Sequence, residues 1–395
     1  MRKIDIVILA GGKGSRIKEY LNNKPKPMLK FNNIYFLQYL LNNLTKYPIN
    51  KVYILTGFKH TIIHKNFHNR IFNFTKIICI KEKKLMGTGG ALLGLKKNKI
   101  DDFLLINGDT IFNVDVDDFV KSFRQKSLGG IALVSKKANT KSLKLNNLAL
   151  NKNFITYKSK SNLINGGVYY FNKKIFKYLI KRPSSLENDI LPKMIEKKLI
   201  KGKIYKDFFV DIGSPKYLKN AKKKLLINFK KPAAFLDRDG VINYDYGYVN
   251  KFKNFKFRKG VIKGLKYLIK KNFYIFIITN QAGIAKGKFK EKDFFNLHKY
   301  LKQYLSKKNI FFDDVQYCPF HPQAKIKRFK KISSLRKPGN KMIQNIFEKF
   351  LINKKKSFMI GDKITDEKCA KKSNLNYFYA EKDFEVQIKN ILKSD

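Results

Sequence analysis

The sequence predicts two α/β domains joined in one chain of 395 residues. Strand-like and helix-like segments alternate in two successive blocks, and each block opens with an apolar strand that runs into a loop rich in glycine or aspartate. This alternation is typical of largely parallel sheets covered by helices. Ligands of such sheets bind beyond the carboxyl ends of the strands, which is where the polar loops of both blocks fall.

The first block predicts a Rossmann-like N-terminal domain with a mixed sheet, at residues 1–226. Its strand-like segments are IDIVILA, KVYILTG, KIICIKE, DDFLLINGD and GIALVSK. Its helical segments include YFLQYLLNNLTKY, GALLGLKK and the closing SPKYLKNAKKKLL. The run INFKKP, residues 227–232, then combines charge with a proline, and we interpret it as the linker between the domains.

The second block predicts a doubly wound parallel sheet at residues 233–395. Its strand-like segments are AAFLDRD, FYIFIITNQ, DVQYCP and SFMIGDK. The helical segments between them are VIKGLKYLIKK, KDFFNLHKYLKQYLSKK and KMIQNIFEKFL.

The charge of the chain is strongly positive, with 85 Lys and Arg against 29 Asp and Glu and a formal net charge of +56. Charge of this size would favour a nucleic-acid binder. The lysines are spread evenly, however, and they accompany abundant Asn, Ile, Phe and Tyr with no Trp, as expected of A/T-rich codons. We therefore expect small-molecule substrates and no specific nucleic-acid partner.

The three cysteines and the first residues bear on the compartment. Cys79, Cys318 and Cys369 lie far apart and provide no disulfide framework, which fits a reducing compartment. The first apolar run is short and meets a charged glycine loop, so we expect neither a signal peptide nor a membrane anchor. We expect a cytoplasmic protein.

A glycine-rich loop, Gly11–Arg16, follows the first strand. Glycines in such a loop let backbone N–H groups approach phosphate oxygens closely. The loop is not a P-loop, because no Gly-Lys-Ser/Thr closes it, and it is not a dinucleotide fingerprint, because Ile17 stands where the third glycine belongs. By itself it leaves open a phosphate site or a plain turn.

Six further stretches accompany this loop in the first block. They are NKPKPML (23–29), LMGTGGAL (85–92), INGDT (106–110), INGGVYYF (164–171), SLENDIL (185–191) and FVDIGSPKYL (209–218). In this order they resemble the sugar-1-phosphate nucleotidyltransferases over residues 1–226. The stretches GFKHTII, GTGGAL, INGGVY and SLENDIL are similar to the heptose-1-phosphate guanylyltransferase branch.

This resemblance implies that a sugar phosphate attacks the α-phosphorus of a nucleoside triphosphate. Two polyanions react, so positioning and charge neutralisation dominate catalysis. Arg16 and Lys26 would stabilise the departing pyrophosphate, and Asp109 and Asp211, each at a strand end, would hold Mg²⁺. The nucleotide-binding residues implied are Gly11, Gly12, Gly14, Ser15, Gly87 and Thr88. The sugar and sugar-phosphate ligands implied are Asn165, Gly167, Glu187 and Lys160.

Two positions depart from the family pattern. Ser15 replaces the usual threonine and keeps the hydroxyl, whereas Ser159 replaces the acid of a common Glu-Lys pair and leaves Lys160 alone. The alternative for Lys160 is an ordinary surface lysine. The alternative for Asp109 and Asp211 is a pair of solvated carboxylates at turns.

Asp237 and Asp239 follow the first strand of the second block. A spacing of two places both on the same side of an extended backbone. One carboxylate can then attack phosphorus while the other acts as acid and base. We interpret Asp237 as the nucleophile and Asp239 as the acid and base, with a purely structural role as the alternative.

The stretches ITNQAGIAKG (278–287), LRKPG (335–339) and MIGDKITDEKCA (359–370) complete this set. Together with the paired aspartates they resemble the haloacid dehalogenase phosphatases, and residues 232–385 are similar to heptose bisphosphate phosphatases and their histidinol-phosphatase relatives. The substrate-binding residues implied are Thr279, Asn280, Arg336 and Lys337. The Mg²⁺ ligands implied are Asp237, Asp239 and Asp362.

One loop departs from these relatives, which carry a zinc site with Cys-x-His and Cys-x-Cys ligand pairs. Cys318 stands at the first ligand position, but Phe320 replaces the histidine, and Ser333 and Leu335 replace the second pair. Adjacent His321 would bring the soft ligands to two, and a structural zinc takes four. We predict that this loop holds no zinc.

The two resemblances together predict a bifunctional enzyme of GDP-heptose and lipopolysaccharide biosynthesis. Its C-terminal domain would convert D-glycero-D-manno-heptose 1,7-bisphosphate to the 1-phosphate, and its N-terminal domain would add GMP from GTP. The alternatives are a mannose- or glucose-1-phosphate nucleotidyltransferase fused to a phosphatase of other specificity, and a nucleic-acid binder, which rests on charge alone. The fusion of a phosphatase to a nucleotidyltransferase favours heptose bisphosphate over histidinol phosphate as the substrate, because histidinol is not a substrate for a nucleotidyltransferase.

Overall fold

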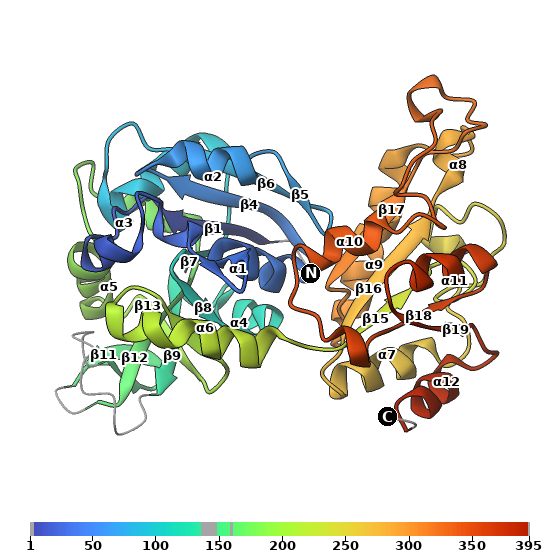
Figure 1. Ribbon diagram of the computed structural model, residues 1–395. Coiled ribbons are helices and arrows are strands. Elements are labelled where there is room, and N and C mark those ends of the chain that lie inside the picture. Colours follow the sequence, from blue (N-terminus) through green and yellow to red (C-terminus); the bar gives the residue numbers. More distant parts are fainter. Residues whose placement is uncertain (1–3, 136–147, 159–160, 394–395) are drawn as a thin grey trace. The chain divides into compact units, whose positions relative to one another are not determined.

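The computed structural model describes residues 4–135, 148–158 and 161–393, which form two compact units (Figure 1). The first unit ends at Leu225 and the second begins at Leu226, with Thr45–Pro48 grouped with the second. Helix α6, Pro215–Phe229, continues past this point, so the first half of the proposed linker is helical. The reason is that Ala221, Leu225 and Phe229 are all buried at a spacing of four, which extends one apolar face through the charged run.

The strands of the first unit include ten that form one sheet. These are β1 (Ile4–Ala10), β4 (Ile49–Thr56), β5 (Ile71–Phe72), β6 (Thr75–Lys81), β7 (Phe103–Asn107), β9 (Gly129–Ser135), β10 (Leu148–Asn151), β11 (Phe154–Tyr157), β12 (Leu163–Phe171) and β13 (Ile200–Tyr205). Two-stranded ribbons are formed by β2 (Lys30–Phe31) with β3 (Ile34–Tyr35), and by β8 (Thr110–Phe112) with β14 (Phe209–Asp211).

The helices described in this unit are short on average. They are α1 (Phe36–Thr45), α2 (His60–Phe67), α3 (Gly87–Gly90), α4 (Val116–Phe123), α5 (Leu191–Glu196) and α6, with 3₁₀ turns η1 (Ser15–Tyr20), η2 (Lys26–Met28), η3 (Ala91–Asn98) and η4 (Lys173–Lys177) and a π-helical turn η5 (Leu186–Ile190).

The large sheet is mixed, as predicted. Its order is β10-β11-β13-β9-β12-β7-β1-β4-β6-β5, and β12 runs antiparallel to both β7 and β9 while β1 is parallel to β4 and β7. The consecutive residues Ile6, Val7 and Ile8 are all fully buried. Burial on both faces explains why β1 reads as a continuous apolar run, and it places the loop after β1 at the middle of the sheet.

The second unit contains a five-stranded parallel sheet with the order β17-β16-β15-β18-β19. Its strands are β15 (Ala233–Leu236), β16 (Tyr274–Asn280), β17 (Asp314–Cys318), β18 (Phe358–Gly361) and β19 (Asn376–Tyr379). Its helices are α7 (Val261–Lys270), α8 (Ala282–Ala285), α9 (Glu291–Ser306), α10 (Lys341–Phe347), α11 (Ile364–Lys371) and α12 (Phe384–Ile391), with 3₁₀ turns η6 (Phe252–Asn254), η7 (Lys327–Phe329) and η8 (Lys354–Lys356).

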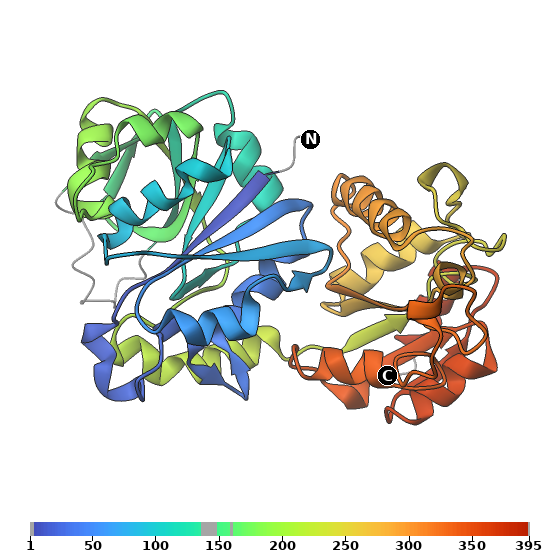
Figure 2. The same cartoon turned by 90° about the horizontal axis from the view of Figure 1, so that it is seen from above.

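Helices cover both faces of this sheet (Figure 2). One core cluster joins Phe235 of β15 and Ile278 of β16 to Met342 of α10 and Cys369 of α11. Alternate strand residues point to the opposite face, toward α7 and α9. This is the doubly wound arrangement predicted from the sequence. In the described parts of the chain, no helix combines the length and the apolar character that crossing a membrane requires.

Candidate active sites

The glycine loop of the first unit leaves β1 and is open to solvent. Gly14 has a left-handed backbone (φ 68°), which turns the chain into η1, and buried Ile17 fixes that turn to the core. Ser15 and Arg16 are exposed, and a side chain added at Gly12 would meet no atom within 4 Å. The predicted nucleotide-binding residues of this loop therefore lie together with free space before them. Glu82, which the sequence reading missed, lies against Gly11.

Asp109 and Asp211 are brought together by the β8–β14 ribbon, which pairs Asp211 with Thr110. Lys26 Nζ lies 2.7 Å from Asp109 Oδ2. Thr110 donates to Asp211 Oδ2 at 3.3 Å, and the Gly213 amide donates to Asp211 Oδ1 at 2.6 Å. Two carboxylates separated by about a hundred positions in sequence thus share one site with the predicted lysine.

This carboxylate pair fits a hard divalent cation. Burial, and after it the neighbouring charge of Asp109, raise the pKa of Asp211 to about 6, although Lys26 opposes the shift. Holding both carboxylates ionised at neutral pH therefore costs free energy, which a bound Mg²⁺ would offset.

A hydrogen-bonded network joins residues that were predicted to bind the nucleoside with residues predicted to bind the sugar. Thr88 donates to Glu187 Oε2 at 2.7 Å and accepts from the Leu186 amide at 2.8 Å. Tyr169 contacts Glu187 Oε1 at 3.4 Å and accepts from Asn165 Nδ2 at 2.8 Å. The structure thus brings Thr88, Glu187 and Asn165 together, and it adds Tyr169, whose position in the core strand β12 hid it in the sequence.

Gly167 adjoins this network. Gly167 has φ 71° and donates its amide to Asn165 Oδ1 at 2.9 Å, so it shapes the turn that presents Asn165. Ser159 and Lys160 lie outside the described residues, and the predicted role of Lys160 stays a prediction.

Gly87→Ala is expected to destabilise the first unit. Gly87 has φ 72°, and a Cβ there would overlap the carbonyl of Ser184. The left-handed conformation alone costs a non-glycine residue about 1–2 kcal/mol, and the overlap adds to this. Urea denaturation of the full chain should show the lowered free energy of unfolding. Gly12→Ala, where space is open, is the matched control and should change it by less than about 0.5 kcal/mol.

In the second unit, three adjacent parallel strands bring the predicted catalytic residues to one edge. Asp237 follows β15, Thr279 lies at the end of β16, and Asp362 follows β18. Gln281 donates to Thr279 Oγ1 at 2.9 Å, which leaves the hydroxyl proton of Thr279 free to donate. The convergence of these groups follows directly from the strand order β16-β15-β18.

Lys337 is the centre of the charged groups at this edge. Its side chain is buried, and Nζ lies 2.9 Å from Asp237 Oδ1, 2.6 Å from Asp366 Oδ1 and 2.8 Å from the Ile278 carbonyl. Asn280 holds the Lys337 backbone through both its amide and its carbonyl, at 3.0 and 3.1 Å. Asn280 was predicted to bind substrate, and in the structure its side chain positions Lys337.

Asp366 was missed in the sequence, where its spacing of four from Asp362 was the available signal. Oxygens of Asp237, Asp362 and Asp366 lie within 4.8 Å of one another. Among the described residues, these three aspartates form the cluster of side chains that could hold a metal ion. Oδ1 of Asp362 is buried and has no hydrogen-bond partner in the part of the chain that the structure describes. Such an acceptor fits a divalent cation bound among oxygen ligands.

Asp239 differs from the prediction that its side chain holds metal. Its carboxylate is turned toward Arg238, which contacts both oxygens at 2.9 and 2.8 Å, and it also accepts from Asn243 and Gln281. Burial would raise the pKa of Asp239, but Arg238 and these hydrogen bonds outweigh it and lower the pKa. Asp239 is therefore held as a carboxylate, and Asp366 takes its place in the metal-type group.

Burial is the main reason that the pKa of Asp237 is raised to about 7; Lys337 opposes the shift, and the charges of Asp366 and Asp239 add to it. Burial also raises the pKa of Asp362. A cation beside these carboxylates would favour the ionised form that a nucleophile requires.

Lys337→Met is expected to destabilise the second unit, because two buried carboxylates would lose their common counter-ion. Breaking a buried ion pair in this way typically costs about 3–5 kcal/mol. Urea denaturation in EDTA measures the loss without compensation by metal. Lys341→Met is the matched control, since its pair with Glu348 is exposed and contributes about 0–1 kcal/mol. Equal stability of the two variants would contradict the central role of Lys337.

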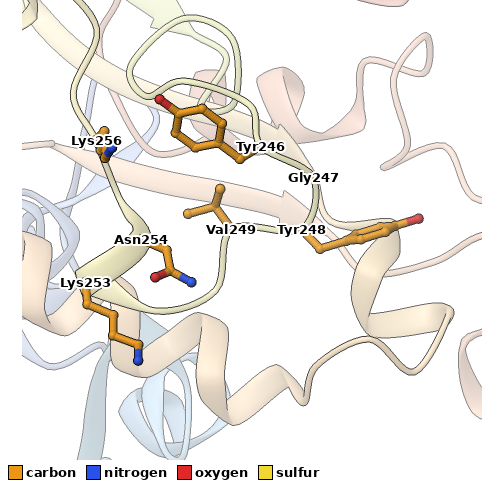
Figure 3. A pocket seen from close by; sticks show the side chains of 7 residues that line it. All are labelled: Tyr246, Gly247, Tyr248, Val249, Lys253, Asn254 and Lys256. Carbon is orange, nitrogen blue, oxygen red and sulfur yellow. The ribbon is translucent and has the colours of Figure 1, made fainter.

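A pocket of about 320 Å³ lies in the loop that follows the paired aspartates (Figure 3). It is lined by Tyr246, Gly247, Tyr248, Val249, Lys253, Asn254 and Lys256. The ring of Tyr248 points away from the other labelled side chains. Two contacts tie this loop to the catalytic edge: Arg238 donates to the Val249 carbonyl at 2.9 Å, and Asp245 lies 3.6 Å from Lys363.

Comparison with known proteins agrees with the two predicted domains. The nucleotidyl transferase family model matches residues 5–144 and 148–228, and the haloacid dehalogenase-like hydrolase model matches residues 328–380. The chain is thus a nucleotidyltransferase followed by a haloacid dehalogenase-like phosphatase. It belongs to the nucleotidyl transferase family, whose model covers more than half of its residues, and through its C-terminal part to the haloacid dehalogenase-like hydrolases.

Individual relatives are as follows. The chain is 40% identical over 144 residues, 36% of its own length and 75% of the relative, to the D-glycero-beta-D-manno-heptose-1,7-bisphosphate 7-phosphatase of Escherichia coli strain K12. It is 36% identical over 164 residues, 41% of its length and 91% of the relative, to the protein of the same name from Rhodopseudomonas palustris. The crystal structure of HddC from Yersinia pseudotuberculosis is 30% identical, covering 56% of this chain and 99% of its own, with a TM-score of 0.47.

Proposed function

We propose that the chain catalyses two consecutive steps of sugar-nucleotide synthesis. The second unit removes the 7-phosphate of D-glycero-D-manno-heptose 1,7-bisphosphate, and the first unit transfers GMP from GTP to the resulting heptose 1-phosphate. The observation that carries the proposal is the presence, in one chain, of a nucleotidyltransferase site and a phosphatase site whose relatives act on a heptose bisphosphate. The product of the phosphatase is then the substrate of its fused partner, and both reactions are assigned to the cytoplasm, where nucleoside triphosphates are present.

The first phosphatase step is attack by Asp237 on the phosphorus. A bond forms between an Asp237 carboxylate oxygen and phosphorus, and the bond from phosphorus to the sugar oxygen breaks. Asp239 is a carboxylate while it faces Arg238, so it acts as the acid only after it has turned toward the substrate and taken up a proton from solvent, which it then passes to the leaving oxygen. Thr279, Arg336 and Lys337 bind the phosphate oxygens and stabilise the charge that gathers on them.

The second step returns the enzyme to its starting state. Asp239, now a carboxylate, takes a proton from water, whose oxygen attacks phosphorus and releases Asp237 with inorganic phosphate. Mg²⁺, when bound by Asp237, Asp362 and Asp366, would neutralise the phosphate charge during both steps. The aromatic and basic pocket beside Val249 provides room for the sugar beyond its reacting phosphate.

The nucleotidyl step joins two anions in the first unit. An oxygen of heptose 1-phosphate attacks the α-phosphorus of GTP, and the bond from that phosphorus to the β-phosphate oxygen breaks to release pyrophosphate. Gly11, Gly12 and Gly14 bind the triphosphate through backbone amides, and Arg16 and Lys26 offset the charge of the leaving group. Asp109 and Asp211 would hold Mg²⁺, which would offset the negative charge of the phosphates.

The sugar and base are assigned to the network around Glu187. Thr88 is assigned to the nucleoside, and Asn165, Gly167 and Glu187 to the sugar hydroxyls, with hydrogen bonds of 2.7–2.9 Å that already orient these groups. Oriented groups favour one hydroxyl pattern over another, because a mismatched sugar would leave a buried polar group unpaired.

The test is incubation of the purified chain with heptose 1,7-bisphosphate, Mg²⁺ and each nucleoside triphosphate in turn, followed by mass analysis. We expect inorganic phosphate whichever triphosphate is present, and pyrophosphate and GDP-heptose with GTP only. Products from mannose 1-phosphate or glucose 1-phosphate, with no turnover of the bisphosphate, would instead support a different sugar. Phosphate release from histidinol phosphate alone would contradict the heptose assignment of the second unit.

A further inference from the structure

We propose that an apolar cluster holds the loop carrying Arg336 and Lys337 in place of the zinc found in related phosphatases, and thereby positions these two residues for catalysis. The cluster consists of Cys318, Phe320, Phe329 and Leu335, and we refer to it as the Cys318 cluster. The proposal rests on the proposed phosphatase activity of the second unit.

The side chain of Cys318 lies at the edge of the core, where its thiol also faces Ser333 and the cations of Arg336 and Lys331. It is fully buried in the same cluster as Phe276 and Ile278 of β16, and its thiol contacts the Phe320 carbonyl at 3.8 Å. Burial raises the pKa of the thiol, whereas a metal ligand must be the thiolate. Cys318 is therefore a small apolar core residue.

Phe320 and Leu335 fill two positions at which relatives carry zinc ligands. Both pack against the core cluster that contains Cys318. The ring of Phe320 also lies 6.1 Å from that of Phe329 and beneath Lys331 Nζ at 3.9 Å. Phe329 is buried, and its carbonyl accepts from the His321 amide at 3.1 Å, which joins the two arms of the loop.

His321 does not replace the zinc ligands that this loop lacks. Its Nδ1 accepts a hydrogen bond from the Gln323 amide at 3.1 Å, so that nitrogen is already occupied. Among the residues that the structure describes, the side chains that could together hold a metal ion are Asp237, Asp362 and Asp366. None of these three belongs to this loop. The residues present do not fit a four-ligand zinc site.

The cluster is coupled to catalysis through the short segment from Leu335 to Lys337. Leu335 is docked in the core, and two positions later Lys337 places its ammonium 2.9 Å from Asp237. Between them, Arg336 is half-buried, and its Nη1 is buried with no hydrogen-bond partner among the described residues. Cys318 is the neighbour that opposes the lowering of the Arg336 pKa by burial, so the guanidinium lies close to the cluster, and Lys337 makes the direct contact with the catalytic edge.

Phe320→Ala and Leu335→Ala test the positioning role. Displacement of Lys337 by about 1 Å is expected to lower kcat for phosphate release by about 10²-fold. Nucleotidyl transfer should stay unchanged. Phe320→Leu and Leu335→Met keep most of the apolar volume and should retain near-normal kcat, which separates positioning from loss of folding. Ile332→Ala, in the same loop but 91% exposed, is the matched control. A kcat within twofold of wild type in both alanine variants would overturn the proposal.

A second variant tests whether the Cys318 cluster takes the structural role that zinc has in related phosphatases. Phe320→His, Ser333→Cys and Leu335→Cys combined with native Cys318 restore four ligands, and we expect one zinc per chain and loss of activity on zinc-selective chelation with Mg²⁺ in excess. The wild type should carry no stoichiometric zinc and keep its activity under the same treatment. Zinc bound by the wild type, and lost in Cys318→Ala, would overturn the proposal.

The readouts also separate this proposal from the proposed function. p-Nitrophenyl phosphate reports phosphatase chemistry for any natural substrate, so it is assayed beside heptose 1,7-bisphosphate. Turnover of the nitrophenyl ester without turnover of the bisphosphate would contradict the heptose assignment. The kcat values of the loop variants with the nitrophenyl ester would still decide the role of the Cys318 cluster. Zinc content is measured without any substrate.

Discussion

Asp237→Asn is expected to abolish phosphate release while nucleotidyl transfer continues at the wild-type rate. An amide cannot form the covalent bond to phosphorus, and loss of such a nucleophile typically lowers kcat by about 10⁴-fold or more. Asparagine has nearly the size of aspartate, so the buried site keeps its shape. Asp366 still pairs with Lys337 at 2.6 Å, so the ammonium keeps a counter-ion.

Two assays on one preparation measure this. Phosphate is released from heptose 1,7-bisphosphate, and GDP-heptose is formed from heptose 1-phosphate supplied directly. Glu348→Gln, an exposed acidic residue of the same unit, is the matched control and should change neither rate. Loss of both activities in Asp237→Asn would contradict two separate sites, and undiminished phosphate release would contradict the nucleophile assignment.

The sequence was most informative where strands are short, apolar and parallel. Asp237 and Asp362 each follow such a strand and Thr279 lies at the end of another. Parallel strands bring their carboxyl ends to one edge whatever the order of the sheet. Their convergence could therefore be predicted. The mixed N-terminal sheet could be predicted only as a class, because the pairing of antiparallel β12 between β7 and β9 depends on contacts distant in sequence.

The rest depended on tertiary contacts that carry no local signal. Asp211 lies beside Asp109 because β14 pairs with β8, and Thr88 meets Glu187 across 99 positions. Asp239 was assigned from its spacing to Asp237, but its orientation is set by the buried charge of Arg238, next to it in sequence. A carboxylate's direction depends on which cation is desolvated nearby, and a spacing rule does not contain that information.

Asp109→Ala is expected to lower nucleotidyl transfer by orders of magnitude without lowering the stability of the first unit. The variant loses one Mg²⁺ ligand and the carboxylate that holds Lys26 at 2.7 Å, so both charges that face the triphosphate are misplaced. The free energy of unfolding should not fall. Burial and the charge of Asp109 both raise the pKa of Asp211, and the variant removes the charge of Asp109. At neutral pH the remaining carboxylate is then held at a smaller free-energy cost.

GDP-heptose formation from heptose 1-phosphate and GTP, measured over a range of Mg²⁺ concentrations, tests the metal role of Asp109 directly. We expect the variant to need far more Mg²⁺ and to stay slow at saturation, since extra metal cannot restore the position of Lys26. Phosphate release by the second unit is the internal control for folding of the preparation. Asp101→Ala is the matched control, because Asp101 lies just before the same strand, β7, and pairs only through an exposed contact with Lys173. Near-normal transfer by Asp109→Ala at limiting Mg²⁺ would contradict its assignment as a metal ligand.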